Sequence, residues 1–138
     1  MILGLGNDLV AIPRLARLWQ RFPQRLQQTL FTEKEYAYAM GHRTPAAELA
    51  KRFAAKEACA KALGVGLKVI GARTTEGIKW QEVEVCSDPA GQPHLRLLGQ
   101  AWNRLISLMP EKTTPMIHVS LSDQYPYALA TVILSARP

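Results

Sequence analysis

The chain has 138 residues, of which 48% are hydrophobic and 20% are charged. These values exclude a disordered chain and predict a single domain over residues 1–138 with its own apolar core. No apolar run reaches the roughly 18 residues of a membrane-spanning helix, and the start MILGLGND does not have the pattern of a signal peptide. We therefore expect a cytoplasmic protein. Its net charge of +6 favours an anionic partner, such as nucleic acid, a phosphorylated small molecule or an acidic protein.

The first elements in chain order are a strand and a helix. Residues 2–10 predict a strand whose glycines allow another backbone to approach closely. Pro13 suits the first turn of a following helix, and Pro23 is expected to interrupt that helix and to be followed by a short turn. Apolar residues recur at helical spacing and predict a core-facing stripe. This stripe consists of Ile12, Leu15, Leu18, Trp19 and Phe22.

Two further helices are predicted next. Thr32 and Glu35 match a capping box, so a helix should begin at Thr32. A Thr-Pro pair begins a long helix over residues 44–63, which Gly64 can end.

The second half of the chain is rich in strands. A loop over residues 66–77 precedes predicted strands at 80–86, 94–97, 116–122 and 128–134, with a helix at 99–109. This order predicts an α+β fold in which a mainly antiparallel sheet packs with a long central helix.

The long helix carries the first candidate site, in the segment KRFAAKEACAKALG (Lys51–Gly64). Glu57 lies at the edge of the apolar stripe, with Lys61 one turn later. An ordinary exposed Glu–Lys pair would stabilise the helix by only about 0.3–0.5 kcal/mol. Arg52 and Lys56 also share one side of the helix, and the alanines leave room for another group. The segment therefore also fits a site in which Glu57 holds a metal ion and the cations neutralise phosphates.

Asp8 is the second candidate, near the end of the first strand. Its ordinary interpretation is turn formation or helix capping. The functional interpretation makes it a second oxygen ligand, because Mg²⁺ is commonly held by one or two carboxylates together with water and substrate phosphates. The sequence does not show whether Asp8 and Glu57 meet.

Two weaker patterns remain. In the segment IHVSLSD, His118, Ser120 and Ser122 share one strand face, which fits either an ordinary half-buried strand or the wall of a ligand pocket. A nucleophilic Ser–His pair is a poor interpretation, since no third orienting residue is evident.

The segment between Asp8 and Glu33 contains no acidic residue. Its four arginines indicate either a solvated face or a docking surface for an acidic partner, and nucleic acid would satisfy the same stripe.

Taken together, these segments resemble the holo-acyl-carrier-protein synthases, the small group of 4′-phosphopantetheinyl transferases. The matching pieces cover most of the chain in family order: GLGNDLVAIPRL, FTEKE, KRFAAKEACAKALG, WQEVEVCSDPAGQPHLRL and HVSLSDQYPYALATVI. The resemblance implies the 4′-phosphopantetheinyl transferase fold. It also implies transfer of the 4′-phosphopantetheine arm of coenzyme A to a serine of acyl carrier protein, in support of fatty acid biosynthesis. The other product would be adenosine 3′,5′-bisphosphate. The cofactor implied by the resemblance is Mg²⁺.

The resemblance also assigns residues. Asp8 and Glu57 match the metal-binding carboxylates and, with Lys61, are the expected catalytic residues. Lys61 would support the leaving phosphate, and Glu57, through a metal-bound water, is the candidate base. The expected contacts of coenzyme A are Arg52, Lys56, Lys61, Gly64, His118 and Ser120. The acidic carrier protein would dock on the first helix at Arg14, Arg21 and Arg25.

The resemblance further implies a homotrimer with active sites between subunits, so that Asp8 could meet Glu57 across an interface. With this assignment, neither a membrane nor nucleic acid is expected as a partner. The alternative of a basic nucleic-acid-binding module lacks an aromatic platform, since aromatic residues are only 7% of the chain. A third interpretation, an inactive interaction protein of the same fold, is opposed by the intact Asp8, Glu57 and Lys61.

Two departures from the family pattern stand out. The loop 67–79 is longer than the usual connection, which leaves its path over the coenzyme undefined. Asp123 occupies a position where many members have histidine, so no role is expected for it.

Overall fold

The computed structural model describes residues 1–67 and 77–138. Its elements are β1 (Ile2–Ala11), α1 (Ile12–Arg21), α2 (Pro23–Leu30), α3 (Glu33–Met40), α4 (Pro45–Leu63), the 3₁₀ turn η1 (Trp80–Glu82), β2 (Val83–Ser87), β3 (Pro93–Leu97), α5 (Gly99–Ser107), β4 (Thr114–Gln124) and β5 (Tyr127–Arg137). The predicted α+β class is confirmed.

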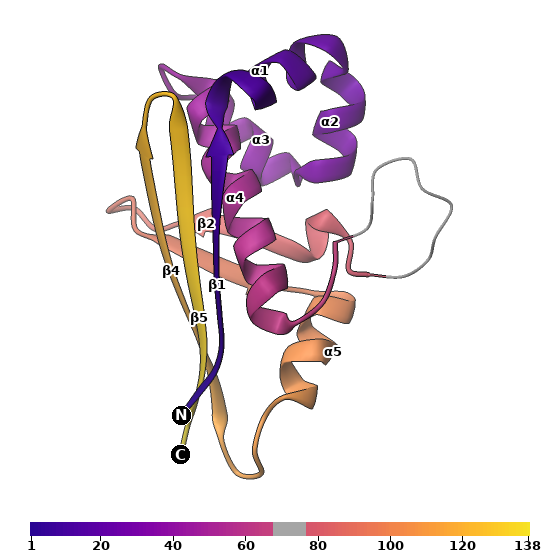
Figure 1. The fold of residues 1–138 in the computed structure, drawn as a ribbon, viewed down its shortest axis with the longest axis vertical. Helices are drawn as coiled ribbons and strands as arrows, with labels where there is room; N and C mark the ends of the chain where they lie inside the picture. Colours follow the sequence, from indigo (N-terminus) through magenta and orange to yellow (C-terminus); the bar gives the residue numbers. More distant parts are fainter. Residues whose placement is uncertain (68–76) are drawn as a thin grey trace.

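The strands form two antiparallel sheets. The larger sheet has the order β1-β5-β4, and the smaller one pairs β2 with β3. Helix α4 lies along the larger sheet, whereas α1, α2 and α3 gather at one end of the molecule and α5 at the other (Figure 1). Side chains alternate along each strand, so the larger sheet has an inner face toward α4 and an outer face.

Strand β1 packs against α4 with almost no side chain between the two backbones. A Cβ atom on Gly6 would collide with the carbonyl oxygen of Ala58, and one on Gly4 with that of Ala62. The close approach predicted for these glycines is therefore confirmed. It brings the Gly4–Gly6 part of β1 directly beside the C-terminal half of α4.

We expect Gly6→Ala to lower the free energy of unfolding by about 1–3 kcal/mol, because the added methyl group must push strand and helix apart. Urea denaturation measures this change. Gly41→Ala is the matched control, since a Cβ atom at Gly41 would meet its nearest neighbour at an ordinary 3.5 Å. Equal stability of Gly6→Ala and the unaltered protein would contradict the backbone contact.

Helix α1 contacts the core less than the sequence predicts. Ile12 and Leu15 are buried, but Leu18 and Phe22 are about 40% exposed. Trp19 is only half-buried and packs edge-on against Tyr36, with ring centroids 6.2 Å apart. The predicted core-facing stripe is therefore confirmed at Ile12, Leu15 and Trp19 and wrong at Leu18 and Phe22, whose side chains turn to solvent.

The turn predicted after Pro23 is also wrong, because Pro23 begins helix α2. A proline is accommodated in the first turn of a helix, where its missing N–H group has no partner to lose. The other helix signals are confirmed. The Thr32–Glu35 capping box is complete, and Gly64 ends α4 in a left-handed conformation with φ of 66°.

Candidate functional site

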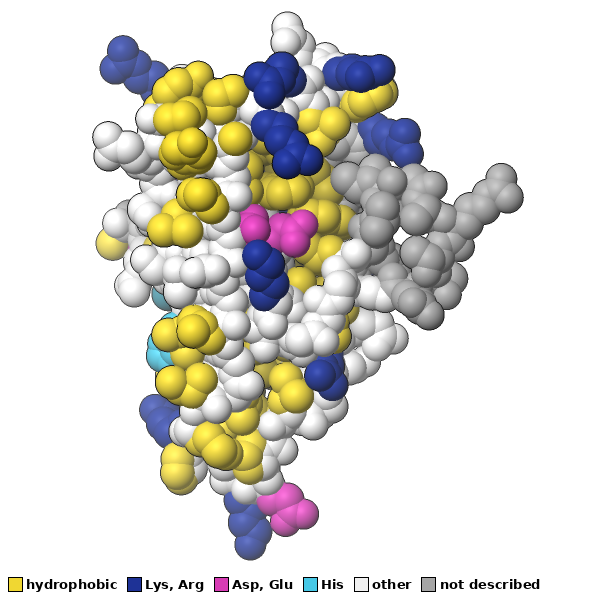
Figure 2. All heavy atoms as spheres, in the orientation of Figure 1, with side chains coloured by type: hydrophobic (Ala, Val, Ile, Leu, Met, Phe, Trp, Pro, Cys, Tyr) yellow, Lys and Arg dark blue, Asp and Glu magenta, His cyan; other side chains and the backbone are white. Residues whose placement is uncertain are grey.

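Asp8 and Glu57 line the same cavity, of about 740 Å³, between β1, α1 and α4. Asp8 lies on the inner face of β1, and Glu57 projects from the helix that packs on this face. The two residues therefore meet within one chain, whereas the sequence left open a meeting across a subunit interface. In Figure 2 the acidic groups form a small patch between basic side chains, beside apolar surface.

Lys61 completes this cluster from one turn further along α4. Its ammonium group lies 3.2 Å from Asp8 Oδ1 and donates a hydrogen bond to the carbonyl oxygen of Asn7 at 2.9 Å. The Lys61 side chain is 55% exposed, so it can turn toward a ligand at modest cost.

The two carboxylates repel each other. Partial burial raises the pKa of Glu57, the negative charge of Asp8 raises it further, and Lys61 opposes both effects. A divalent cation between the carboxylates would relieve this repulsion, and their hard oxygen atoms are donors that Mg²⁺ prefers. No cluster of three or more potential metal ligands exists among the described residues. Two carboxylates fit Mg²⁺ that keeps water and phosphate oxygens at its other positions.

A basic rim borders the carboxylates. Arg14, Arg17 and Arg21 line the same cavity from α1, and Arg25 lines a smaller adjoining one of about 260 Å³. All four side chains are exposed. Between them lie the exposed apolar side chains of Leu18 and Phe22, so the rim can receive a partner that is both acidic and partly apolar.

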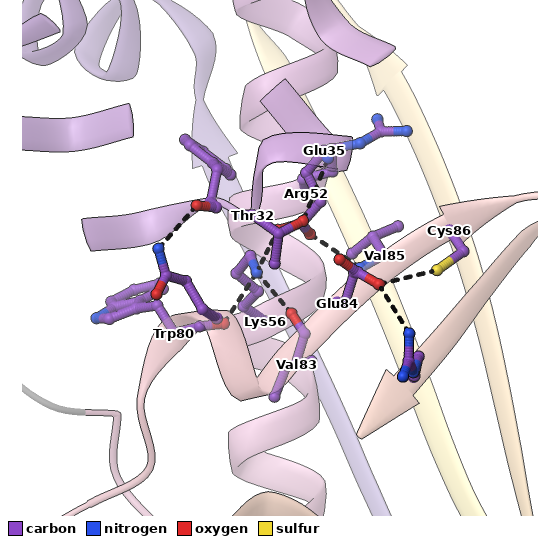
Figure 3. Close-up of polar contacts among 12 residues, drawn as sticks. Thr32, Glu35, Arg52, Lys56, Trp80, Val83, Glu84, Val85 and Cys86 are labelled. Atoms are coloured by element: carbon purple, nitrogen blue, oxygen red, sulfur yellow. Dashed lines mark hydrogen bonds and ion pairs between the residues drawn. The ribbon is translucent and has the colours of Figure 1, made fainter. Parts of the chain in front are cut away.

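Lys56 does not face this cavity, contrary to the predicted contact with coenzyme A. Its side chain is fully buried and donates hydrogen bonds to Glu35 Oε1 and to the carbonyl oxygens of Trp80 and Val83 (Figure 3). Burial lowers the pKa of Lys56, and the attraction of Glu35 opposes this shift. All three N–H groups are engaged within the chain, so the prediction that Lys56 binds a phosphate needs correction.

Arg52 needs the same correction. Its side chain is 2% exposed and forms an ion pair with Glu48 Oε2 at 3.0 Å, while its guanidinium group lies 4.2 Å from the centroid of the Tyr38 ring. Its charge is therefore directed toward the start of α4 and toward α3, away from the carboxylate pair.

Three other predicted contacts lie away from the carboxylates within the chain. His118 and Ser120 are exposed on the outer face of β4, on the side of the sheet opposite to Asp8. Gly64 borders a different region, near Arg104, whose Nε donates to the carbonyl oxygen of Leu63 at 2.9 Å. The structure does not bring these residues to the cavity of Asp8.

The two departures from the family pattern have separate outcomes. Asp123 forms an ion pair with Lys51 at 3.0 Å and thereby ties the end of β4 to α4. Most of the loop 67–79 lies outside the described residues, but Leu67 and Ile78, near its ends, pair in a parallel bridge.

Phe53 is a site residue that the sequence analysis did not identify. It lines the cavity one turn before Glu57 and stacks on Trp80, with ring centroids 4.9 Å apart. Its i−4 spacing from Glu57 was the available signal.

In the part of the chain that the structure describes, no helix has the length and apolar character that a membrane span requires.

Comparison with known proteins gives concordant matches. The family described as "4′-phosphopantetheinyl transferase superfamily" matches residues 4–130. The holo-[acyl-carrier-protein] synthase of Maricaulis maris is 44% identical over all of this chain and 92% of its own length. The solved structure of the Chronobacterium ammoniagenes ACPS–CoA complex matches with a TM-score of 0.75 and 28% identity, covering 98% of each chain. The holo-[acyl-carrier-protein] synthase of Neisseria meningitidis matches with a TM-score of 0.74 and 29% identity, covering 98% of this chain and 99% of that one. These matches give no support to a nucleic-acid-binding module.

Proposed function

The chain belongs to the holo-acyl-carrier-protein synthase group of the 4′-phosphopantetheinyl transferase superfamily, and from this membership we propose its reaction, metal and assembly. It transfers the 4′-phosphopantetheine arm of coenzyme A to a serine of apo-acyl carrier protein and releases adenosine 3′,5′-bisphosphate. The reaction depends on Mg²⁺ and serves fatty acid biosynthesis in the cytoplasm. The observation that carries this proposal is the convergence of Asp8, Glu57 and Lys61 on one cavity.

In this proposal each residue of the cluster has a distinct task. Asp8 and Glu57 hold Mg²⁺, which when bound withdraws negative charge from the diphosphate of coenzyme A. Lys61 supports the phosphate that leaves with the adenosine. Its exposed ammonium group suits this task, since phosphoryl transfer depends mainly on positioning and on stabilisation of charge.

The proposed reaction is tested by incubating the protein with apo-acyl carrier protein, coenzyme A and Mg²⁺. We expect the intact mass of the carrier protein to rise by one phosphopantetheine group, and expect no rise when EDTA replaces Mg²⁺. An unchanged mass under all conditions would refute the transfer reaction. Labelling that persists in EDTA would refute the metal requirement alone.

The arginine rim is proposed as the docking surface for the carrier protein. We expect Arg14→Glu combined with Arg21→Glu to raise the KM for the carrier protein roughly tenfold or more, because both substitutions place acidic groups against an acidic partner. The KM for coenzyme A should change much less. Steady-state kinetics with each substrate varied in turn measures the difference.

Lys34→Glu combined with Arg43→Glu is the matched control for this test. It makes the same change in net charge at exposed positions that do not line the cavity. Equal effects of the Arg14 and Arg21 substitutions on both substrates would contradict a docking role.

We propose a homotrimer assembled through the outer face of the larger sheet. This face exposes large apolar side chains that would be costly to leave in water. They are Ile2, Leu5, Leu9 and Leu129, with exposed fractions of 68%, 64%, 61% and 40%. Assembly through this face would also bring His118 and Ser120, which lie on it, close to the site of a neighbouring subunit.

Leu5→Arg should convert the trimer to monomers while the chain stays folded, because this side chain is exposed in the single chain and becomes buried only on assembly. Sedimentation equilibrium measures the mass of the assembly. Ile106→Arg, at an exposed position of α5, is the control and should leave that mass unchanged. An unaltered protein that sediments as a monomer would refute the proposed assembly.

A further inference from the structure

A fully buried ion pair holds the middle of α4 in place. Figure 3 shows the ammonium group of Lys56 surrounded by acceptors from other elements. It bonds Glu35 of α3 at 2.8 Å, the carbonyl oxygen of Trp80 in η1 at 2.9 Å and the carbonyl oxygen of Val83 in β2 at 2.5 Å. Both charged side chains have no exposed surface.

Glu35 uses both of its oxygen atoms to extend the same network. Oε1 accepts hydrogen bonds from the backbone N–H of Thr32 at 2.8 Å and from Lys56, and Oε2 accepts one from the backbone N–H of Val85 at 2.9 Å. The pair thus joins α3, α4 and the β2 segment at one point. We call the pair Lys56–Glu35 the clamp.

Helix α4 needs such a directional contact. On its sheet side it meets the glycines of β1 through alanines, such as Ala58 and Ala62. This surface allows close approach but has few protruding side chains that would fix the helix against rotation or sliding. Apolar burial is non-directional, whereas hydrogen bonds specify distance and angle. Lys51 and Lys61 give α4 more exposed polar contacts with β4 and β1, and the clamp adds a directional contact that is fully buried.

The clamp lies next to the site in the sequence. Lys56 immediately precedes Glu57, so any rotation or axial shift of the helix at Lys56 moves Glu57 as well. Adjacent helical residues point about 100° apart, so one side chain can be anchored in the interior while the next faces the cavity. Productive sites require a precision of about 0.5 Å, and a misplacement of about 1 Å can lower the rate roughly 100-fold.

We propose that the clamp is a positioning device that sets Glu57 at the distance from Asp8 that a divalent cation requires. This inference rests on the proposed function, since it concerns the same metal site. Lys56 and Glu35 are therefore positioning residues and touch neither substrate nor metal. Burying two charges costs free energy that their attraction offsets only in part, so fixing the geometry is the contribution that the clamp makes best.

The test is the double variant Glu35→Gln with Lys56→Met, which removes both charges and leaves no unpaired buried ion. We expect the Kd for Mn²⁺, used as a spectroscopic substitute for Mg²⁺, to rise about tenfold or more, and kcat to fall about tenfold to 100-fold. The KM for the carrier protein should not change, because the arginine rim belongs to α1 and α2 and the clamp to neither. Electron paramagnetic resonance of free Mn²⁺ gives the affinity independently of transfer activity.

Two further variants keep the test decisive. Leu105→Ala creates a cavity beside α5, which supplies no partner of the clamp, and should lower the melting temperature without changing the Kd for Mn²⁺. If the double variant fails to fold, Glu35→Gln alone takes its place. It keeps the side-chain shape and should raise the Kd for Mn²⁺ by a smaller factor. Retained Mn²⁺ affinity and kcat in folded clamp variants would overturn the inference. If the unaltered protein transfers no phosphopantetheine but the clamp variants still bind Mn²⁺ more weakly, the proposed function fails and the clamp stands.

Discussion

Glu57→Gln is expected to lower the rate of phosphopantetheine transfer by at least about 10³-fold, because a neutral amide replaces one of the two carboxylates proposed to hold the metal. The same substitution should leave the fold intact or stabilise it. The pKa of Glu57 is raised partly by the negative charge of Asp8, and removing one of two repelling charges relieves that repulsion. Loss of activity should therefore accompany an unchanged or higher melting temperature. Intact-mass assays and thermal denaturation measure the two quantities.

Glu48→Gln is the matched control on the same helix. Glu48 binds Arg52 and Lys51 and does not line the cavity. Its substitution should lower the melting temperature, because buried Arg52 loses its charged partner, and should change the transfer rate only a few-fold. The two variants thus have opposite expected patterns. A Glu57→Gln protein that keeps a tenth or more of the activity would refute the metal assignment.

Lys61→Met is expected to act in opposite directions on metal binding and on catalysis. The ammonium group lies 3.2 Å from Asp8 Oδ1, where it competes with a cation for that oxygen atom. Its removal should strengthen Mg²⁺ binding several-fold. The transfer rate should nevertheless fall roughly 10²–10³-fold, because the leaving phosphate loses its positive partner.

Calorimetric titration with Mg²⁺ and measurement of kcat separate these two effects. Lys34→Met, at an exposed lysine of α3, should change neither quantity. Weaker Mg²⁺ binding in Lys61→Met would show that the lysine supports the metal site instead of competing for it. Unchanged kcat would remove Lys61 from the catalytic residues.

The sequence predicts the local elements well, because their signals lie within a few residues of one another. The capping box at Thr32 and the left-handed end of α4 at Gly64 are both of this kind. The prediction of a turn after Pro23 is wrong because a proline can end one helix and begin the next, and the sequence alone does not separate these cases.

The site was predictable as a set of residues but not as an arrangement. The sequence indicates that Asp8 and Glu57 are candidate ligands, but their meeting depends on the contact between β1 and α4. The sequence predicts phosphate contacts for Lys56 and Arg52 because it records charge and not burial. Lys56 and Glu57 are adjacent on the helix, but Lys56 is anchored in the interior and Glu57 faces the cavity. Only the packing of α3 and β2 against the helix decides which of the two is buried.

The glycine–alanine contact between β1 and α4 has a consequence for inhibitor design. The contact does not line the cavity, but it fixes the strand that carries Asp8 against the helix that carries Glu57 and Lys61, so the spacing of these groups cannot widen for a bulkier ligand. A small chelating group should therefore suit the two carboxylates, and chemical elaboration belongs at the entrance, where long arginine side chains adjust to the ligand. Selectivity between related enzymes should accordingly arise from α1, and resistance by substitution should appear there before it appears beside the metal ligands.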